Sequence, residues 1–321
     1  METIRIINFI ITAIFAVCYS YQFIYVPVSL WMQHREKKAK KAALSNPSGN
    51  ADNELCERNL KNYAVLICAR NEEGVIGDLI DSINNQTYKG GVTTFVMADN
   101  CTDNTYGVAI AHGAVAYTRR SMDKIGKGYA MEALLGEIKK DFPSGFDGYF
   151  VFDADNILAP NYIEEMHKCH LEGNEAITSY RNIKNYGDNW VSAGYGLWFL
   201  RETMYLNYAR YKLGSSAAIS GTGFFFSDAV LKDIGGWPFH LLTEDIEFTI
   251  NRVCKGRKIA FCRSAVFYDE QPTSLRQSFR QRMRWARGYF QVFHHYGKAL
   301  TRETFHGNFA AFDMAMNIMP A

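Results

Sequence analysis

Two acidic side chains, Asp153 and Asp155, flank one small residue directly after the apolar run 149–152. Carboxylates at this spacing can both reach one hard cation, and Mg²⁺ or Mn²⁺ prefers oxygen ligands, commonly one or two carboxylates together with substrate phosphates. Such an ion acts as a Lewis acid that neutralises the charge of a departing phosphate. A polar strand end that leads into the next helix near Pro160 explains the same pair without any chemistry, so the pair needs support from other residues.

A second acidic pair, Glu244 and Asp245, follows Thr243 at the start of a stretch with helical periodicity, 246–253. In the functional interpretation Asp245 is a general base that takes the proton from an attacking hydroxyl, with Glu244 as its neighbouring catalytic candidate. In the alternative interpretation Thr243 is an N-cap, and the helix dipole favours the two acids in the first turn. Both interpretations predict that a helix begins here.

The stretch 274–296 is basic, aromatic and helix-like, and it contains Gln281, Arg284 and Trp285. An arginine can make forked hydrogen bonds to phosphate oxygens, and a tryptophan offers a flat face to a sugar ring. Alternatively, the stretch is an amphipathic helix on a membrane surface with its arginines toward the lipid headgroups. The two interpretations can hold for different faces of one helix.

The elements that would position these residues alternate between strand and helix. Apolar runs at 64–69, 93–98, 114–117 and 149–152 are separated by helical patterns at 73–84, 105–112 and 128–140. This alternation predicts an α/β fold with a mainly parallel central sheet, which binds ligands beyond the carboxyl ends of its strands. Polar clusters follow three of these runs directly. Neither a GxGxxG sequence after the first strand nor a Walker A sequence is present, so a Rossmann dinucleotide site is not expected.

An uncharged stretch at 6–31 is long enough to span a bilayer as one helix, and 34–41 after it is strongly basic. A signal peptide would have a shorter apolar core and a small-residue cleavage site, so we expect a retained anchor. The positive-inside rule then places the N-terminus outside and the rest of the chain in the cytoplasm at the cell membrane. We therefore expect a transmembrane anchor at 1–33 and a basic, polar cytoplasmic linker at 34–58.

The composition limits the partners and the redox chemistry. The formal net charge of +2 gives no reason to expect nucleic acid. Seven cysteines, an odd number without a CxxC pair, indicate reduced and mostly buried thiols rather than a disulfide framework. His167 and His170 lie about one turn apart but have no evident third ligand, so a packing or surface role is expected.

The motifs D, DxD, TED and QxxRW, here Asp99, Asp153-Ala154-Asp155, Thr243-Glu244-Asp245 and Gln281-x-x-Arg284-Trp285, occur in one order over roughly residues 60–300. This order resembles glycosyltransferase family 2, which includes cellulose, hyaluronan, chitin and poly-N-acetylglucosamine synthases. The resemblance implies a GT-A fold and an inverting, single-displacement reaction. It implies Asp155 as the main metal contact, Asp245 as the base, Arg284 at the pyrophosphate and Trp285 under the acceptor sugar.

The same resemblance implies further substrate contacts. The segment Ala69-Arg70-Asn71-Glu72, together with Asp99, would hold the uracil and ribose of a UDP-sugar. Lys127 would contact the donor diphosphate or sugar, and the segment Gly221-Thr222-Gly223 would lie beside the acceptor. The full set of substrate-binding candidates is Ala69, Arg70, Glu72, Asp99, Lys127, Asp153, Gly221, Thr222, Gly223, Gln281, Arg284 and Trp285. Many relatives have a second Asp or a Gly where this chain has Asn100, and the polymer-exporting relatives carry several membrane helices after QxxRW.

These observations predict a catalytic domain at 59–273, an interface helix at 274–300 and the start of a further membrane or interface segment at 301–321. The leading hypothesis is a metal-dependent hexosyltransferase that uses Mg²⁺ or Mn²⁺ to move N-acetylglucosamine or glucose from a UDP-sugar to a polysaccharide. The alternatives are single addition to a lipid-linked acceptor, a catalytically silent membrane scaffold, or a regulator that binds nucleotide sugar. Membrane lipids are expected partners, and both self-association and a separate export partner stay open.

Overall fold

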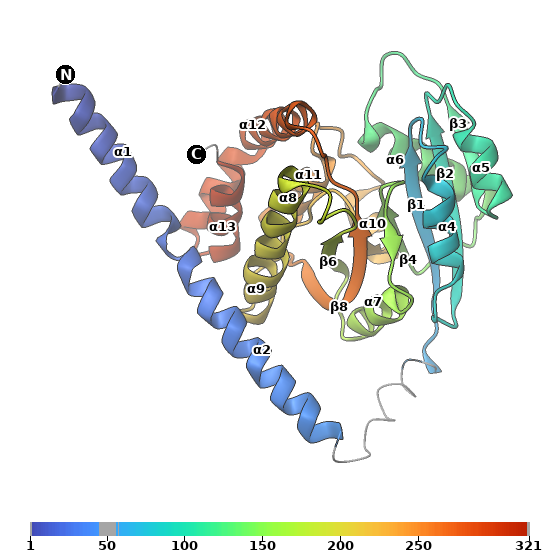
Figure 1. The fold of residues 1–321 in the computed structure, drawn as a ribbon, viewed down its shortest axis with the longest axis horizontal. Helices are drawn as coiled ribbons and strands as arrows, with labels where there is room; N and C mark the ends of the chain where they lie inside the picture. The colour runs from blue at the N-terminus through green and yellow to red at the C-terminus, as the bar shows by residue number, and fades with distance from the viewer. Residues whose placement is uncertain (1, 45–55, 57, 320–321) are drawn as a thin grey trace.

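The N-terminal part of the computed structural model is a pair of helices, α1 (Glu2–Ser20) and α2 (Gln22–Leu44), and the structure describes residues 2–44, 56 and 58–319. Figure 1 shows α1 and α2 as one nearly straight rod whose N-terminal end extends beyond the rest of the molecule. By length and composition, the helical stretch Glu2–Ala39 is able to cross a membrane. The predicted linker at 34–58 is therefore helical as far as Leu44, and its residues 45–55 and 57 lie outside the described residues.

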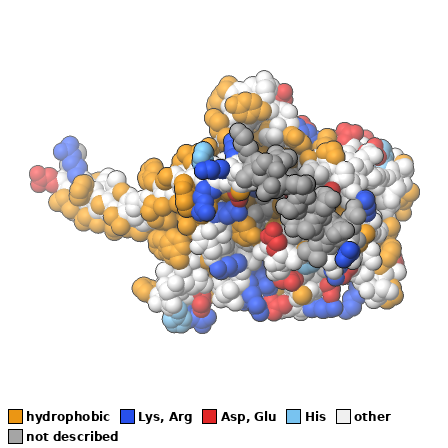
Figure 2. Space-filling view, turned by 90° about the horizontal axis from the view of Figure 1, so that it is seen from below, with side chains coloured by type: hydrophobic (Ala, Val, Ile, Leu, Met, Phe, Trp, Pro, Cys, Tyr) orange, Lys and Arg blue, Asp and Glu red, His pale blue; other side chains and the backbone are white. Residues whose placement is uncertain are grey.

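The apolar side chains of α1 pack very little against the rest of the protein. None of its described residues is buried, and isoleucine, phenylalanine and valine side chains along it are more than 45% exposed. Figure 2 shows the projecting segment covered by hydrophobic side chains, with charged side chains gathered at its far end. A continuous exposed apolar surface of this kind indicates contact with lipid or with another protein.

The predicted alternation of strands and helices is confirmed in the first half of the catalytic region. In chain order the elements are β1 (Asn62–Ala69), α4 (Ile76–Asn84), β2 (Gly91–Asp99), α5 (Thr105–Ala111), β3 (Val115–Arg119), α6 (Lys127–Asp141) and β4 (Gly148–Phe152). Strands β1, β2 and β4 form because their continuous apolar runs are buried on both faces of a sheet, whereas β3 lies at its edge and is only partly buried. Helix α4 buries one side only, through Ile76, Leu79, Ile80 and Ile83.

The second half adds strands to the same sheet and helices around its edge. Its elements are β5 (Ile157–Leu158), α7 (Tyr162–Leu171), β6 (Ala176–Ile183), α8 (Trp190–Leu200), η1 (Arg201–Asn207), α9 (Tyr208–Lys212), β7 (Phe224–Ser227), α10 (Asp228–Ile234), α11 (Glu244–Cys254), β8 (Ala260–Asp269), α12 (Leu275–Phe305) and α13 (Phe309–Ile318). Helix α12 thus continues past the predicted boundary at 300.

The described strands form one eight-stranded sheet in the order β3-β2-β1-β4-β7-β6-β8-β5. The run β3-β2-β1-β4 is parallel, β6 pairs parallel with β8, and the remaining pairs are antiparallel. Helices α4, α5 and α7 cover one face, and α6 covers the other (Figure 1). In register, Ala69 is opposite Ala98, and Ile67 is opposite Phe152, so the carboxyl ends of β2, β1 and β4 lie side by side.

The C-terminal helix α13 joins the catalytic region to the N-terminal rod. Asp313 on α13 and Arg210 on α9 form an ion pair with both side chains completely buried. The hydroxyls of Tyr21 and Tyr25 donate hydrogen bonds to the two Asp313 oxygens over 2.7 and 2.9 Å. Because each polar atom of Asp313 is satisfied, the charge can stay buried where the rod, α9 and α13 meet.

Candidate functional site

The loops after β1 and β2 bring the first predicted residues together at the edge of the sheet. Asn71 and Asn100 have φ angles of 58° and 55°, a region that asparagine tolerates better than most residues. The Asn71 side chain accepts a hydrogen bond from the Thr102 N–H over 2.8 Å, which ties one loop to the other. These turns hold Ala69, Arg70 and Glu72 beside Asp99.

Asp99 is buried at 6% exposure and has a cationic partner that the sequence analysis did not identify. The Arg119 guanidinium donates to the Asp99 carboxylate over 2.5 Å. The two residues are opposite each other in the parallel pairing of β2 with β3. The sequence does show one strand that ends in aspartate and a later one that ends in arginine. The contact between these two residues could be predicted only if the register of the two strands were known.

Carboxylates gather around Asp155 at the end of β4. Burial, followed by the negative charges of Asp269 and Asp153, raises the pKa of Asp155 to about 8. Burial and Asp153 likewise raise the pKa of Glu72. Repulsion of this kind marks a place where a divalent cation would relieve excess negative charge. Among the described residues, no group of three His, Cys, Asp or Glu side chains is placed so that it could hold a metal ion. A bound ion would therefore need phosphate oxygens of the donor as ligands in addition to Asp155.

Lys127, the first residue of α6, connects the two acidic motifs. Its ammonium donates hydrogen bonds to the Asp153 carboxylate and, over 2.8 Å, to the Gly221 carbonyl oxygen. It also lies 3.8 Å from a Glu244 oxygen. Burial by itself lowers the pKa of Lys127, but the carboxylates of Asp153 and Glu244 outweigh burial and raise it. The DxD and TED motifs therefore share one cation.

Asp245 and Glu244 lie in the first turn of α11, and both are buried. The Gly221 N–H donates to the Asp245 carboxylate over 2.5 Å. Burial raises the pKa of Asp245 and raises that of Glu244 to about 8. Thr243 occupies the N-cap position, as predicted, but its hydroxyl is buried without a hydrogen-bond partner in the described structure. Simple helix capping thus explains the position of this motif only in part.

The segment Gly221-Thr222-Gly223 fixes the distance between the two acidic motifs. Gly221 and Gly223 have φ angles of 80° and 66°, which disfavour any side chain. The Thr222 hydroxyl accepts a hydrogen bond from the Asp153 N–H over 2.8 Å. One segment therefore contacts Asp153, Lys127 and Asp245 at once.

A cavity of about 340 Å³ opens beside this network and has the size of a small-molecule site. The predicted residues that line it are Lys127, Asp153, Gly221, Glu244, Asp245, Gln281, Arg284 and Trp285. The side-chain oxygen of Gln281 is buried and has no hydrogen-bond partner in the described structure. Trp285 packs edge-on against Tyr195 and Phe199, with ring centroids 6.1 and 6.5 Å away.

The other predicted residues lie next to this cavity rather than in its lining. Ala69, Arg70, Glu72, Asp99 and Asp155 are at the carboxyl ends of β1, β2 and β4. Thr222 and Gly223 form the backbone behind it. The lining also contains residues outside the predicted set: Arg181, Tyr195, Trp198, Phe199, Glu202, Ser220 and Tyr289. They come from β6, α8, η1, the loop before β7 and α12, and no local motif marks them.

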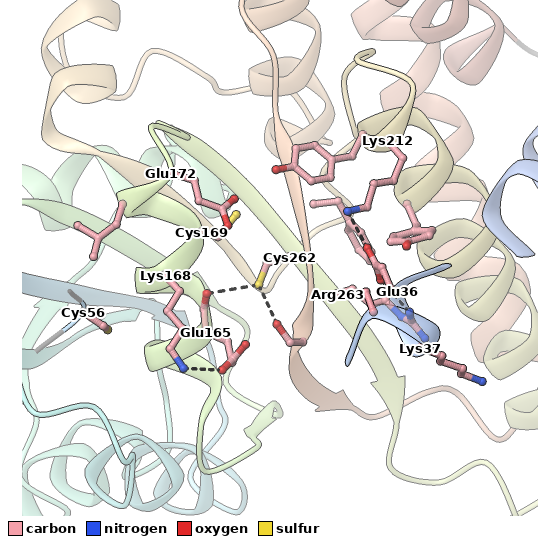
Figure 3. A pocket seen from close by; sticks show the side chains of 16 residues that line it. Glu36, Lys37, Cys56, Glu165, Lys168, Cys169, Glu172, Lys212, Cys262 and Arg263 are labelled. Atoms are coloured by element: carbon pink, nitrogen blue, oxygen red, sulfur yellow. Dashed lines mark hydrogen bonds and ion pairs between the residues drawn. The ribbon is translucent and has the colours of Figure 1, made fainter. Parts of the chain in front are cut away.

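A larger cavity of about 1000 Å³ lies between α2, α7, α9 and β8 (Figure 3). Several of its charged side chains form ion pairs: Glu36 lies 2.7 Å from Lys212, and Lys168 lies 3.0 Å from Glu165. None of the predicted site residues lines it. The pairs that Glu36 makes with Lys212 and, over 3.3 Å, with Arg263 hold α2 against the catalytic region, whereas the acidic network of the predicted motifs lies at the smaller cavity.

The predicted roles of His167 and the cysteines are confirmed. His167 is fully buried, shares a 2.7 Å hydrogen bond between its Nδ1 and the Tyr63 hydroxyl, and has a pKa lowered by burial. In the described structure the seven cysteines form no disulfide; three are buried and four are partly exposed. Packing, rather than metal binding, explains His167.

A sheet of this order, with acidic loops at the carboxyl ends of its parallel strands and a separate carboxylate opposite them, defines a GT-A-like fold. Among solved structures, a mannosyltransferase from Pyrobaculum calidifontis in complex with GDP-mannose and Mn²⁺ superposes with a TM-score of 0.57. That match covers 95% of this chain and 85% of the other, at 15% identity. At this identity the likeness concerns the fold alone.

Residues 61–288, more than half of the chain, match the family described as Glycosyltransferase like family 2. The chain therefore belongs to glycosyltransferase family 2, as the order of its motifs predicted. It is 25% identical to the "Probable glycosyltransferase YdaM" of Bacillus subtilis, over 72% of this chain and 56% of the relative. It is 26% identical to a beta-monoglucosyldiacylglycerol synthase of Nostoc sp., over 80% of this chain and 56% of the relative. The chain thus spans about half the length of these relatives.

Proposed function

We propose that the protein is a membrane-bound, metal-dependent inverting glycosyltransferase that transfers a hexose, N-acetylglucosamine or glucose, from a UDP-sugar to a polysaccharide acceptor on the cytoplasmic side. The observation that carries this proposal is the connected set of Asp153, Lys127, Gly221, Glu244 and Asp245 at the wall of one cavity. A donor phosphate site and a base face each other there. A scaffold or a binding regulator needs no such buried base.

The transfer follows from this arrangement. Asp245 accepts the proton of the acceptor hydroxyl as that oxygen forms a bond to C1 of the donor sugar. The bond between C1 and the phosphate oxygen breaks at the same time, and UDP leaves with the electron pair. Because attack and departure occur on opposite faces of C1, the anomeric configuration inverts. Gly221 holds the Asp245 carboxylate through its N–H, which fixes the direction of proton transfer.

Charge on the departing diphosphate must be balanced by the protein. Arg284 is exposed at the cavity and has no hydrogen bond or ion pair within the described structure, so its guanidinium is available for phosphate oxygens. Lys127 lies at the centre of the network and can exchange a carboxylate contact for a phosphate contact. A Mg²⁺ or Mn²⁺ ion held by Asp155 would supply Lewis-acid stabilisation of the leaving group when bound.

Membrane attachment is supported by two separate apolar surfaces. The first is the exposed face of α1 and the first half of α2, which would span the bilayer with the N-terminus outside. The second is a rim beside the cavity mouth, which we define as Trp190, Leu197 and Trp198 of α8 and Phe279 and Phe290 of α12, all at least 50% exposed. Large apolar side chains mixed with arginines on α12 are typical of a helix at a membrane interface.

A second candidate function, single addition to a lipid-linked acceptor, is favoured by this apolar rim. It is also supported by the similarity to relatives that are named beta-monoglucosyldiacylglycerol synthases. An acceptor drawn from the bilayer would enter the cavity between α8 and α12. The difference between the two candidates lies in the product, since a polymer grows by repeated addition and a glycolipid does not.

The test is a donor screen with the full chain in detergent or lipid, in which released UDP is measured for a panel of UDP-sugars with Mn²⁺. We expect one or two UDP-hexoses to release UDP only when an acceptor is present. Radiolabelled sugar then reports the length of the product and separates polymer from single addition. Binding of UDP without turnover for any donor or acceptor would contradict the proposed activity.

A further inference from the structure

The segment η1 (Arg201–Asn207) is a π-helical stretch between α8 and α9. Backbone hydrogen bonding of this type is rare and occurs often at functional sites, because it redirects side chains that a regular helix would place elsewhere. Its second residue, Glu202, lines the catalytic cavity together with Asp245. Glu202 therefore adds a second carboxylate to the cavity that contains the proposed base.

Glu202 is partly buried and has no ion-pair partner in the described structure. Two cations lie near it, but each already has its own carboxylate. Arg210 donates to both oxygens of Asp313 over 2.7 and 2.9 Å, and Arg181 donates twice to Asp269. The structure describes no ion pair of Glu202 itself, and its contact to the Ser220 hydroxyl is long, at 3.5 Å. Its hydrogen-bonding capacity is thus left for a ligand.

Glu202 is close enough to Asp245 for one small molecule to contact both. Ser220, which Glu202 contacts, directly precedes Gly221, whose N–H is bonded to Asp245. Tyr289 of α12 lines the same cavity, and after burial the largest influences that raise its pKa are the negative charges of Glu202 and Asp245. A ligand with two neighbouring hydroxyls can therefore present one to each carboxylate.

Part of the wall is aromatic. Tyr195, Phe199 and Trp285 pack against one another, and the Arg181 guanidinium stacks on the Phe199 ring at 3.8 Å. Flat rings beside carboxylate acceptors suit a sugar, which has apolar CH faces and hydroxyls around its edge. A simple alcohol with one hydroxyl would cover Glu202 without giving it a hydrogen bond, and shielding an unpaired carboxylate from water is costly.

We propose that Glu202 is an acceptor-binding residue that accepts a hydrogen bond from a second hydroxyl of the acceptor, and that the reacting end of the acceptor is therefore a sugar unit. This inference rests on the proposed function. The sugar unit can belong to an oligosaccharide or to a glycolipid, because both present the same pair of hydroxyls. Diacylglycerol, which has one free hydroxyl, does not satisfy Glu202.

The experiment measures transfer from UDP-glucose and UDP-N-acetylglucosamine by the full chain with Mn²⁺. The acceptors are cellobiose, phosphatidylcholine vesicles with monoglucosyl-dioleoylglycerol, and the same vesicles with dioleoylglycerol. We expect transfer to one or both sugar-bearing acceptors and little to dioleoylglycerol. Cellobiose activity identifies an oligosaccharide as the source of the sugar unit, and vesicle activity identifies a glycolipid. Equal or better use of dioleoylglycerol would overturn the inference.

The variants are Glu202→Gln and Glu202→Ala, with Glu137→Gln on the outer surface of α6 as the matched control. A hydrogen bond to a charged group contributes about 1.5–3 kcal/mol, so the acceptor KM should rise by roughly 10- to 150-fold in Glu202→Ala. The Kd for UDP should not change, which also shows that the variant is folded. An unchanged acceptor KM in both Glu202 variants would overturn the proposed contact.

A deoxygenated acceptor tests the contact without any variant. When the hydroxyl next to the reacting one is removed from the acceptor, the acceptor KM of the wild-type enzyme should rise by about the same factor as in Glu202→Ala. When the deoxygenated acceptor is used with Glu202→Ala, the two effects should not add. Additive losses would show that Glu202 binds something else. Failure of the underlying function looks different, because then no arm binds a UDP-sugar or releases UDP.

Discussion

Replacement of Asp245 by asparagine tests the proposed base most directly. The two side chains have nearly the same shape, and an asparagine oxygen can still accept the 2.5 Å hydrogen bond from the Gly221 N–H. The cavity, Lys127 and Asp153 should therefore stay in place. What is lost is the ability to accept a proton, so the variant should bind UDP as the wild type does and fail in transfer.

The expected loss follows from the surroundings of Asp245. A general base contributes 10²- to 10⁴-fold to a rate, which corresponds to about 2.7–5.4 kcal/mol of barrier. Glu244 is the nearest replacement, but it is buried and lies 3.8 Å from the Lys127 ammonium. It is therefore badly placed to take over, and kcat should fall by roughly 10³-fold or more.

Transfer of radiolabelled sugar under saturating substrates measures kcat, and titration with UDP measures binding. Asp228→Asn is the matched control, because Asp228 occupies the first turn of α10 outside the cavity. The pH profile gives a second readout: burial raises the pKa of Asp245, and the base must be ionised. Wild-type kcat should thus rise with pH through a pKa above the usual aspartate value of about 3.9. Asp245→Asn with unchanged kcat would refute the assignment.

The remaining predictions concern the metal, the glycine segment and the buried ion pair. Chelation of divalent cations should abolish transfer, and Asp155→Asn should raise the Mn²⁺ concentration for half-maximal rate on the order of tenfold or more; full activity in chelator would remove the metal from the reaction. Gly223→Ala should lower the free energy of unfolding by about 2–5 kcal/mol, because φ is 66° and the new Cβ would lie 2.1 Å from a phenylalanine ring. The control Gly187→Ala should change thermal stability little, because the space around Gly187 is open. Asp313→Ala leaves Arg210 buried and unpaired, so thermal unfolding in detergent should show a loss of about 3–5 kcal/mol, and an unchanged melting temperature would mean that α13 does not hold the rod to the catalytic region.

The predictions from sequence were most accurate in the first half of the catalytic region. Each apolar run became a strand of the parallel set, and each helical pattern became a helix within a few residues of the expected bounds. Burial on both faces explains this accuracy, because a short, continuous apolar run such as 149–152 is typical of a fully buried strand. The basic run after the membrane segment was assigned to a linker, but it continues α2, and its Glu36 is held by Lys212 of α9.

The candidate site was predicted in its motifs and incomplete in its partners. Asp153, Glu244 and Asp245 were recognised from local patterns, but their shared contact with Lys127 and Gly221 was not. Arg119 beside Asp99 depends on the register of two strands. Glu202 depends on a π-helical stretch that no residue pattern in 201–207 signals.

The amino-acid sequence alone determined where strands end and which acids follow them, because apolar runs and turn-forming asparagines act over a few neighbouring residues. It also determined the apolar N-terminal helix, for the same local reason. Only the tertiary structure decided which charge meets which. Lys127 forms ion pairs with Asp153 and Glu244, Arg181 forms an ion pair with Asp269, and Glu202 lines the cavity. The distances between these charged groups are set by the packing of distant helices on one sheet.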